Sequence, residues 1–437
     1  MENILLIGKY SSVEPLGLMF LAGALKEEGH QVKIFLFKEP DGSDIVLNSC
    51  RENYSFIGFG CYTGVHKIIY RKADILRSCA PVIIGGPHAT SFMKECVAHA
   101  DYVVPGEGLD SIRSITNRLV TPGIVFSPYL IPADYLPFPN RKPVYDAYPE
   151  LKNSKIKSVI TSMGCPFSCF YCYIDTYRNL YPKFKVRQRS VDVIIKECHD
   201  LLKYPTELIY FQDDCFGANI SWLEEFAKRF KKEVGVPFHC QLRPEFVTPV
   251  RSHLLKLAGC HGITMAIETV NDDVRNNLLN RKNSIAQIKS AGDLIKSYDF
   301  RFRTEQMLGL PETTLNDELD LLSLNIGLQP DIAWTSVFAP YLGTSLGDWC
   351  KANGWYSGTN DDLTDSFFSN TCLNFPKDRA RATNRLHRIF STCAKMPFGR
   401  ELAKKLIESN SSSSFDEWYQ VMRQHLYDEC LYKVEGN

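Results

Sequence analysis

The sequence has no net charge, since its 437 residues include 50 basic and 50 acidic side chains. Proteins that bind nucleic acid usually carry an excess of positive charge, which this sequence does not have, so we expect no nucleic-acid partner. It also lacks any apolar run long enough to span a membrane, and its first apolar run, Ile4–Ile7, is too short and too strand-like for a signal peptide. We therefore expect a cytoplasmic protein with no membrane partner.

The composition that remains is that of a globular protein with many cysteines. Hydrophobic residues make up 44% of the chain and charged residues 23%, and the length predicts two or three domains. Fifteen cysteines without a secretion signal indicate reduced thiols that are available for metal binding or catalysis. An odd number of cysteines also fits poorly with a pure disulfide framework.

The most informative pattern is formed by Cys165, Cys169 and Cys172, which follow the spacing C-x3-C-x2-C. Cysteine thiolates are the usual ligands of four-iron clusters, and three of them leave one iron without a protein ligand. Such an open iron can bind a small molecule, so the cluster becomes a reagent as well as an electron carrier. The structural alternative is three buried cysteines, because a free cysteine packs as a small hydrophobic residue.

The first part of the chain alternates short apolar strands with helices, which predicts a doubly wound parallel sheet, a Rossmann-like domain over residues 1–120. Ligands of such sheets bind beyond the carboxyl ends of the strands. Three loops lie there, and they contain Thr63 and Gly64, Gly85 and Gly86, and Glu107 and Gly108. Plain turn chemistry is the alternative explanation for these glycines. Repeated prolines then predict an extended linker over residues 121–150.

A second series of strand and helix units predicts a partial (β/α)6 barrel over residues 151–344. Polar residues gather at the ends of its strands, which places a site on the carboxyl-terminal face together with the three cysteines. Residues 345–437 are expected to form a mostly helical capping region. Its predicted elements are the helices Arg379–Cys393, Phe398–Ile407 and Phe415–Tyr432, with a linker at Ser409–Ser414.

Two features of the capping region have a functional and a structural interpretation. The separations of Cys350, Cys372, Cys393 and Cys430 are too long for cluster ligands, so scattered buried thiols are expected rather than an auxiliary cluster. A basic segment could receive an anionic substrate or form the solvated face of a helix, and the second is favoured. Its members are Lys377, Arg379, Arg381, Arg385 and Arg388.

With these residues in view, the chain resembles the radical S-adenosylmethionine enzymes that carry a cobalamin-binding domain. The resemblance covers residues 1 to about 345 and is strongest at the cysteine triad, with Tyr171 before the last cysteine. Other matching segments are each weak, but their order and spacing together are specific. They are Pro15–Leu18, Gly85–Thr90, Ala100–Val104, Gly106–Gly108, Val186–Ser190, Phe211–Phe216, Ala266–Thr269, Met307–Pro311 and Pro340–Thr344.

The resemblance implies a [4Fe–4S] cluster on Cys165, Cys169 and Cys172, whose unique iron chelates S-adenosylmethionine. It assigns the methionine amino group to Asp213 and Asp214, for which helix capping is the structural alternative. The resemblance further implies a ribose contact for Glu268, an adenine contact for Tyr171, and backbone passage beneath the nucleoside at Gly309. Arg243 and Arg303 are expected near the same mouth, either bound to a carboxylate or phosphate or held in rim salt bridges.

The resemblance also implies that the front domain binds cobalamin, through the loops that hold Thr63, Gly64, Gly85, Gly86, Glu107 and Gly108. The D-x-H-x-x-G pattern of the cobalamin mutases is missing after the first strand, where the chain reads Gly8–Val13. A histidine lower ligand from that loop is therefore not available, and a vestigial domain remains an alternative. His66 and His88 are expected to be hydrogen-bonded loop residues rather than cobalt ligands.

The function that the resemblance implies is methylation of an unactivated carbon or of phosphorus in a small, biosynthetic substrate, driven by a 5′-deoxyadenosyl radical. It also implies an external reductant such as flavodoxin or ferredoxin. A ring contraction, cyclisation, cyclopropane formation or other rearrangement is the main alternative, and a cobalamin or redox sensor is a second. A methylthiotransferase would need a cysteine triad after the first strand, and Cys50, Cys61, Cys79 and Cys96 do not supply one.

Overall fold

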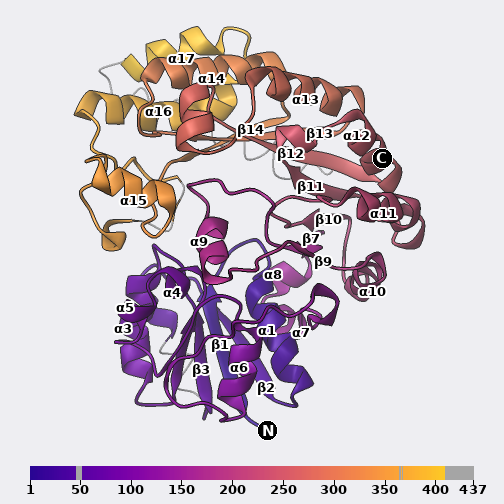
Figure 1. Cartoon of the computed structure of the whole chain (residues 1–437), viewed down its shortest axis with the longest axis vertical. Helices are drawn as coiled ribbons and strands as arrows, with labels where there is room; N and C mark the ends of the chain where they lie inside the picture. The colour runs from indigo at the N-terminus through magenta and orange to yellow at the C-terminus, as the bar shows by residue number, and fades with distance from the viewer. Residues whose placement is uncertain (46–51, 364–365, 367, 409–437) are drawn as a thin grey trace.

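A computed structural model of the chain describes residues 1–45, 52–363, 366 and 368–408. The predicted helix Phe415–Tyr432, the linker Ser409–Ser414, Cys50 and Cys430 lie outside these residues. Two parallel sheets organise the molecule, the front sheet in the lower half of Figure 1 and the barrel sheet in the upper half. Among the described residues, no helix combines the length and the apolar character that a membrane span needs.

The front sheet has six parallel strands in the order β2-β1-β3-β4-β5-β6. Apolar runs bounded by glycine or polar residues form its strands, which are buried on both faces. The strands are β1 (Asn3–Lys9), β2 (Gln31–Phe37), β3 (Phe56–Gly60), β4 (Val82–Gly85), β5 (Tyr102–Val104) and β6 (Gly123–Ile124). The helices are α1 (Leu16–Glu27), α3 (His66–Leu76), α4 (Pro87–Ser91), α5 (Met93–Cys96) and α6 (Gly108–Thr116). The strand order reverses next to β1, which is where such sheets bind ligands.

The barrel sheet also has six parallel strands, in the order β14-β13-β12-β11-β10-β7, and it curls into a half-barrel. The strands are β7 (Ile156–Val159), β10 (Leu208–Phe211), β11 (Phe238–Leu242), β12 (Cys260–Glu268), β13 (Arg301–Leu308) and β14 (Ile332–Val337). The helices on its outer side are α10 (Val191–Leu201), α11 (Ile220–Glu233), α12 (Pro249–Ala258), α13 (Ile285–Ser297) and α14 (Leu315–Leu328). A small antiparallel pair, β8 (Ser162–Met163) and β9 (Arg187–Gln188), and helix α9 (Tyr173–Leu180) complete this part. The two predicted sheets are thus confirmed.

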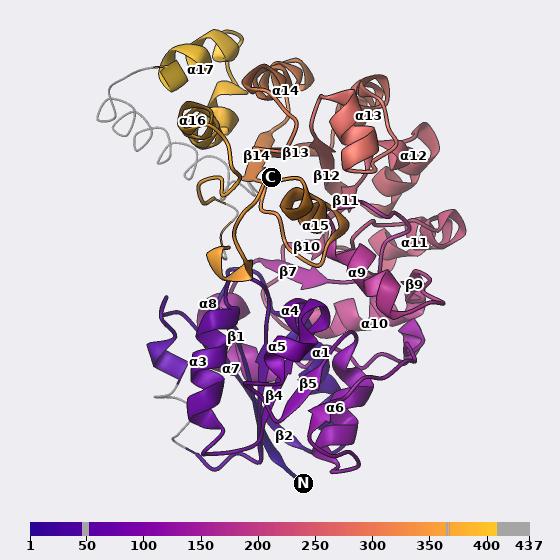
Figure 2. The same ribbon diagram turned by 60° about the vertical axis from the view of Figure 1, so that its left-hand side comes forward.

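The capping region packs on the end of the half-barrel next to β14. Its helices are α15 (Ser345–Ala352), α16 (Lys377–Cys393) and α17 (Gly399–Glu408), and Figure 2 shows α16 and α17 beside α14. Leu386, Ile389 and Phe390 bury the apolar stripe of α16 in the core of the barrel. The predicted helices Arg379–Cys393 and Phe398–Ile407 are therefore confirmed to within a few residues.

The expectation of an extended linker was wrong over its second half. Residues 121–150 contain the short turn Ala133–Tyr135, helix α7 (Lys142–Ala147) and the beginning of α8 (Pro149–Lys152). Pro143 and Pro149 lie in the first turns of these helices, where a backbone N–H has no helical partner and proline is tolerated. The Tyr148 hydroxyl contacts the backbone of Leu36 in β2, so this segment packs on the front domain.

A cluster of buried charges joins the two halves of the molecule. Arg141, at the start of α7, contacts Glu197 of α10 at 3.1 Å and Glu14 at 3.5 Å. Arg189 contacts the other oxygen of Glu197 at 2.6 Å. Glu14 also accepts a hydrogen bond of 2.5 Å from the backbone N–H of Ser158 in β7. None of the four charged side chains is more than 6% exposed, so each charge depends on its partners.

We predict that Glu197→Gln lowers the free energy of unfolding by about 3–5 kcal/mol, because it leaves Arg141 and Arg189 buried with too little negative charge. Urea unfolding followed by circular dichroism measures this change. Glu207→Gln is the matched control, since Glu207 pairs with Lys155 at the surface and should contribute about 0–1 kcal/mol. An unchanged unfolding midpoint for Glu197→Gln would contradict the assigned role of the cluster.

Candidate active site

The three cysteines lie on a loop that β8 delivers and that α9 follows. Gly164 opens the loop with a φ of +91°, a conformation that glycine adopts without strain. The N–H of Cys172 donates to the carbonyl of Cys169 at 3.0 Å, and α9 starts directly after Cys172. Burial raises the pKa of Cys165, and it raises that of Cys172 to about 12, with a further contribution from the neighbouring cysteine sulfurs. The three thiols therefore lie close to one another at one loop.

The loop presents three thiols, and cysteine thiolates are the usual ligands of iron–sulfur clusters. Among the described residues, no three His, Cys, Asp or Glu side chains converge closely enough to hold one ion. Each thiolate of a four-iron cluster binds a different iron, so its sulfurs must stand apart. The guanidinium of Arg243 donates to Sγ of Cys169 at 3.2 Å, so a cation contacts one of the three thiols.

Two arginines hold the cysteine loop in place. Arg178 of α9 donates to the carbonyls of Cys165 and, at 3.0 Å, of Phe167. Arg243 follows β11, and its guanidinium lies 3.7 Å from the centre of the Phe167 ring while it also pairs with Glu245 at 2.5 Å. Of the two interpretations left open for Arg243, the structure shows an ion pair at the rim. The role of Arg178 could not be predicted from the sequence, because most arginines in short helices are solvent-exposed or form surface ion pairs.

Asp213 and Asp214 follow β10 but lie in different surroundings. Asp213 is 1% exposed, and its carboxylate accepts hydrogen bonds from the hydroxyls of Thr161 and Ser162, both at 2.6 Å, and from the Thr161 N–H. The Asp213 carboxylate thus contacts the segment that leads into the cysteine loop, and its assignment to the methionine amino group stays a prediction. Asp214 is the solvent-accessible one of the two, and desolvation by the surrounding protein together with the charge of Asp213 raises its pKa to about 6.

Tyr171 and Glu268 meet at the mouth, as the prediction for one shared site requires. The Tyr171 hydroxyl donates to Oε1 of Glu268 at 2.7 Å. Arg281, which the sequence analysis missed, contacts the same oxygen at 3.3 Å and the Tyr171 hydroxyl at 3.0 Å. Glu268 has a φ of +68° at a β-bulge, which turns its side chain out of the regular strand. Burial raises the pKa of Tyr171, so its hydroxyl stays protonated as the donor.

Gly309 lies at the end of β13 with a φ of +70°, in the left-handed region. Its N–H donates to the buried carboxylate of Glu318 at 2.8 Å, and Arg379 of α16 pairs with Glu318 at 2.7 Å. The expectation that the basic segment is a solvated face is therefore wrong for Arg379, which has a buried partner. It holds for Arg381, whose partner is the exposed Asp378.

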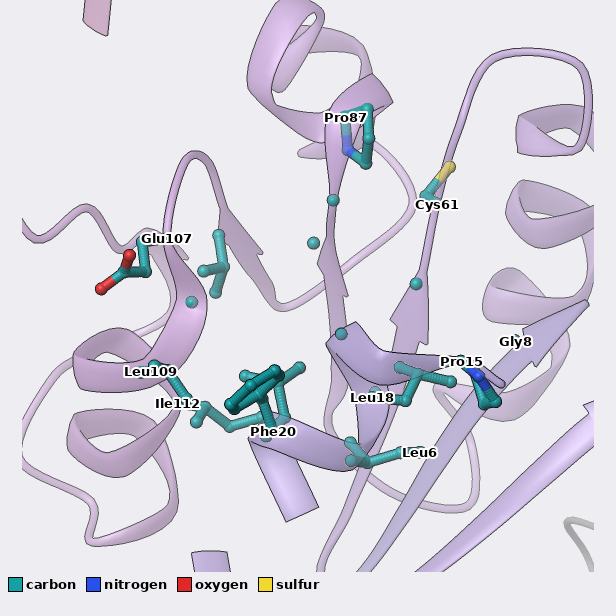
Figure 3. A pocket seen from close by; sticks show the side chains of 18 of the residues that line it. Leu6, Gly8, Pro15, Leu18, Phe20, Cys61, Pro87, Glu107, Leu109 and Ile112 are labelled. Carbon is teal, nitrogen blue, oxygen red and sulfur yellow. The ribbon is translucent and has the colours of Figure 1, made fainter. Parts of the chain in front are cut away.

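An apolar cavity of about 520 Å³ opens at the carboxyl edge of the front sheet, a size typical of ligand sites. Phe20, Leu109 and Ile112 form one wall, and Glu107 stands at the rim (Figure 3). The predicted residues Gly85, Gly86, Glu107 and Gly108 all line it. Because the glycines that line the cavity carry no side chains, a ligand has room to lie against the sheet. The cavity therefore fits the apolar part of a large cofactor, such as the base of the nucleotide tail of cobalamin.

Thr63 and Gly64 are not among the residues that line this cavity, and their contact with cobalamin stays a prediction. The Thr63 hydroxyl contacts Nδ1 of His88 at 2.9 Å, and the Gly64 N–H donates to Nδ1 of His66 at 3.1 Å. The two imidazoles are stacked at 4.2 Å, and their Nε2 atoms contact Tyr70 at 3.0 Å and Asp361 at 2.9 Å. Both histidines are thus hydrogen-bonded, as expected, and all four of their ring nitrogens have a partner in the protein.

The cysteines of the capping region follow the expectation of separate buried thiols. Cys350 packs against the cluster around Leu346 and Leu373, with Cys372 partly buried nearby, whereas Cys393 lies in the core of the barrel. Among the described residues these three do not form a metal site, and Cys430 lies outside them.

Comparisons with known proteins agree with this geometry. The family model of the radical SAM superfamily matches residues 159–324, and that of the B12 binding domain matches residues 3–115. An uncharacterised methyltransferase of Pyrococcus horikoshii is 26% identical over 375 residues, which cover 78% of this chain and 79% of that protein. The anaerobic magnesium-protoporphyrin IX monomethyl ester cyclase of Rubrivivax gelatinosus is 22% identical over 76% of this chain and 66% of its own length.

A solved structure shares the fold. The radical S-adenosylmethionine methyltransferase TsrM from Kitasatospora setae, with cobalamin and a [4Fe–4S] cluster bound, superposes with a TM-score of 0.63. The match has 15% sequence identity and covers 82% of this chain and 79% of TsrM. The match to the radical SAM superfamily implies a [4Fe–4S] cluster and S-adenosylmethionine as cofactors, and the match to the B12 binding domain implies cobalamin. The chain therefore belongs to the radical S-adenosylmethionine enzymes that carry an amino-terminal cobalamin-binding domain.

Proposed function

We propose that the protein is a cobalamin-dependent methyltransferase that transfers a methyl group to an unactivated carbon or phosphorus atom of a small biosynthetic substrate. The bound cofactors supply the one-electron cleavage of S-adenosylmethionine and the methyl transfer. The protein supplies position, enclosure and charge. The methyltransferase relative from Pyrococcus horikoshii supports methylation as the outcome.

One observation supports this function most directly: helix α9 connects the two cofactor sites. It starts after Cys172, and Tyr177 on the same helix lines the apolar cavity of the front domain. Five helical residues span about 7.5 Å. A cluster on the cysteines and a cobalamin in the cavity would therefore face the same gap, and Figure 1 shows α9 in that gap between the two sheets. A substrate bound there lies within reach of both.

We assign the cluster to Cys165, Cys169 and Cys172 and the S-adenosylmethionine contacts to residues around them. Asp213 and Asp214 would receive the methionine ammonium group, and Asp214, the exposed one of the two, would make the charge-assisted contact. Glu268, held by Tyr171 and Arg281 through one oxygen, keeps the other for the ribose. Gly309 would let the backbone approach the nucleoside. Cobalamin would bind at Gly85, Gly86, Glu107 and Gly108.

We further propose a domain division at residues 1–120, 121–150, 151–344 and 345–437, and a reducing, cytoplasmic setting. None of the described cysteines forms a disulfide, which supports such a setting. A small iron–sulfur or flavin protein such as ferredoxin or flavodoxin would supply the electron. We expect no nucleic acid and no membrane among its partners.

A rearrangement without methyl transfer is the second candidate, and the resemblance to the Rubrivivax cyclase favours it over others. Anaerobically reconstituted protein with hydroxocobalamin, S-adenosylmethionine and a strong reductant separates the candidates. Methyl transfer predicts both S-adenosylhomocysteine and 5′-deoxyadenosine in the products. Production of 5′-deoxyadenosine alone would favour a rearrangement. A protein that forms neither product would favour a sensor and contradict both enzymatic candidates.

We predict that replacing Cys165, Cys169 and Cys172 together by alanine removes the iron–sulfur absorbance and all cleavage of S-adenosylmethionine. The reason is that these thiolates are the proposed ligands, and a four-iron cluster is held by cysteine thiolates. Iron content and absorbance spectra of anaerobic protein measure the effect. Cys79→Ala, at an exposed position, is the control and should keep both properties. A triple variant that retains its cluster would refute the assignment.

We predict that Gly108→Leu weakens hydroxocobalamin binding by about tenfold or more, which is 1.4 kcal/mol or more. A Cβ at Gly108 would meet Leu21 and Val104 at 3.5 Å, an ordinary contact, so the added atoms fill the cavity without breaking α6. Absorbance titration measures the affinity. Gly327→Leu on α14, where a Cβ meets nothing within 4 Å, is the control. Equal affinities of the two variants would exclude this cavity as the cobalamin site.

We predict that Asp214→Asn weakens binding of S-adenosylmethionine and removes its dependence on pH. The raised pKa of Asp214, about 6, means that its carboxylate is charged above that pH and becomes protonated below it. Only the charged form pairs with an ammonium group, so the affinity of the wild type should fall as the pH drops through about 6. Calorimetry on the reconstituted protein measures this, with Asp200→Asn at the surface as control. An unchanged pH profile in Asp214→Asn would contradict the assignment.

A further inference from the structure

The inner face of the half-barrel carries a pair of opposite charges that the proposed cofactor sites do not use. Along β13, Thr304 points to the outer helices and bonds to Asn325 at 2.6 Å. Because side chains of a strand alternate between its faces, Arg303 and Glu305 point to the inner face. Inner positions of barrels normally hold packed aliphatic residues. Packing of the barrel interior therefore does not explain why Arg303 and Glu305 are charged.

Arg303 and Glu305 form an ion pair at 2.8 Å and remain 29% and 24% exposed. The pair leaves binding capacity on both partners. Nε of Arg303 is buried and has no hydrogen-bond partner among the described residues, and the contact uses only one oxygen of Glu305. The guanidinium also lies 5.3 Å from the centre of the Trp334 ring on β14. A further charge-assisted contact on each group would use this remaining capacity, so both groups are suited to a ligand.

The surroundings add no further net charge. His239 on β11 stacks with Tyr210 at 5.0 Å and contacts the hydroxyl of Thr264 at 2.7 Å. Burial and the charge of Arg303 lower the pKa of His239 to about 3, so its ring is neutral at neutral pH. Glu268, the nearest other carboxylate along the strands, is paired with Arg281. A ligand on this face therefore meets one cation and one anion side by side.

The pair also lies close to the proposed reaction centre. Glu305 is opposite Ala266 in the register of β12 and β13, two residues before Glu268. Two residues of a strand span about 7 Å, which is the distance from the pair to the level of Glu268 and Tyr171. A molecule held by the pair would thus extend from the inner face toward the mouth. Its far end would lie beside the nucleoside.

We propose that Arg303 and Glu305 bind the substrate, and that the substrate is a zwitterion, an α-amino acid or a small molecule with an ammonium and a carboxylate group close together. The ammonium would pair with Glu305 and the carboxylate with Arg303, so that the four charges alternate in sign. A ligand with a single charge would place that charge beside one partner of like sign, and the pair therefore selects against it. Trp334 offers an apolar surface for the rest of the molecule. This inference deepens the proposed function and rests on it.

The test uses ligands that lose one charge at a time. The probes are L-tryptophan, L-phenylalanine, L-leucine and L-methionine, each beside its N-acetyl and methyl ester derivative, with saturation-transfer NMR on the purified protein as the measurement. We expect at least one amino acid to bind, and each of its derivatives to bind about tenfold or more weakly, since each loses one charge-assisted contact. If no amino acid binds, or if the derivatives bind as well as their parents, the proposal is overturned.

Variants of the pair assign each contact to its residue. In Arg303→Gln the amino acid should bind no better than its methyl ester, and in Glu305→Gln no better than its N-acetyl derivative. Arg301→Gln is the matched control on the same strand, since Arg301 pairs with Asp331 at the exposed end, and it should bind as the wild type does. Cleavage of S-adenosylmethionine by the wild type is assayed separately. A wild type that cleaves it but binds no zwitterion refutes the substrate class alone, and one without a cluster refutes the proposed function.

Discussion

The geometry of the site depends on two buried carboxylates, Glu14 and Glu197, that fasten the front domain to the half-barrel. Glu14 directly precedes the residues of α1 that line the apolar cavity, and it accepts the N–H of Ser158 in the strand that leads to the cysteine loop. Glu197 binds Arg141 and Arg189 from the other side. Such a cluster adds little to stability compared with apolar packing, but it tolerates few alternative arrangements. It therefore fixes the front domain against the half-barrel.

Much of the fold could be predicted because parallel strands buried on both faces appear as short apolar runs. Gln31–Phe37 and Leu208–Phe211 are two such strands. Several helices were not predicted, α9 and α14 among them. Helix α14 has a wide buried face with many leucines, whereas the apolar side chains of α9 are only partly buried. The prolines of the linker were interpreted as helix breakers, although proline is tolerated in a first turn.

The site could be predicted where its residues are local in sequence and not where tertiary contacts assemble it. The cysteine triad is one short motif. Arg281, in contrast, contacts Tyr171, from which 110 residues of chain separate it. Its neighbours Asn280 and Lys282 have φ values of +55° and +58°, and because neither is a glycine, the sequence gives no sign of this left-handed conformation. Asp213 matched the motif that binds an ammonium group, but its hydrogen bonds to Thr161 and Ser162 could not be predicted, because 52 and 51 positions separate it from these partners in the chain.

Both sheets place their sites at the carboxyl edges of parallel strands, but they present different surfaces there. The front sheet offers glycines and apolar side chains, which suit a bulky cofactor that is bound by enclosure. The half-barrel offers Arg243, Glu268 and Arg281 at its mouth and the pair of Arg303 and Glu305 within, which suit molecules that are recognised by charge. A reactive species formed between them is thus bounded by an apolar wall on one side and by fixed charges on the other. This division lets one gap exclude water and still hold a polar substrate in a single orientation.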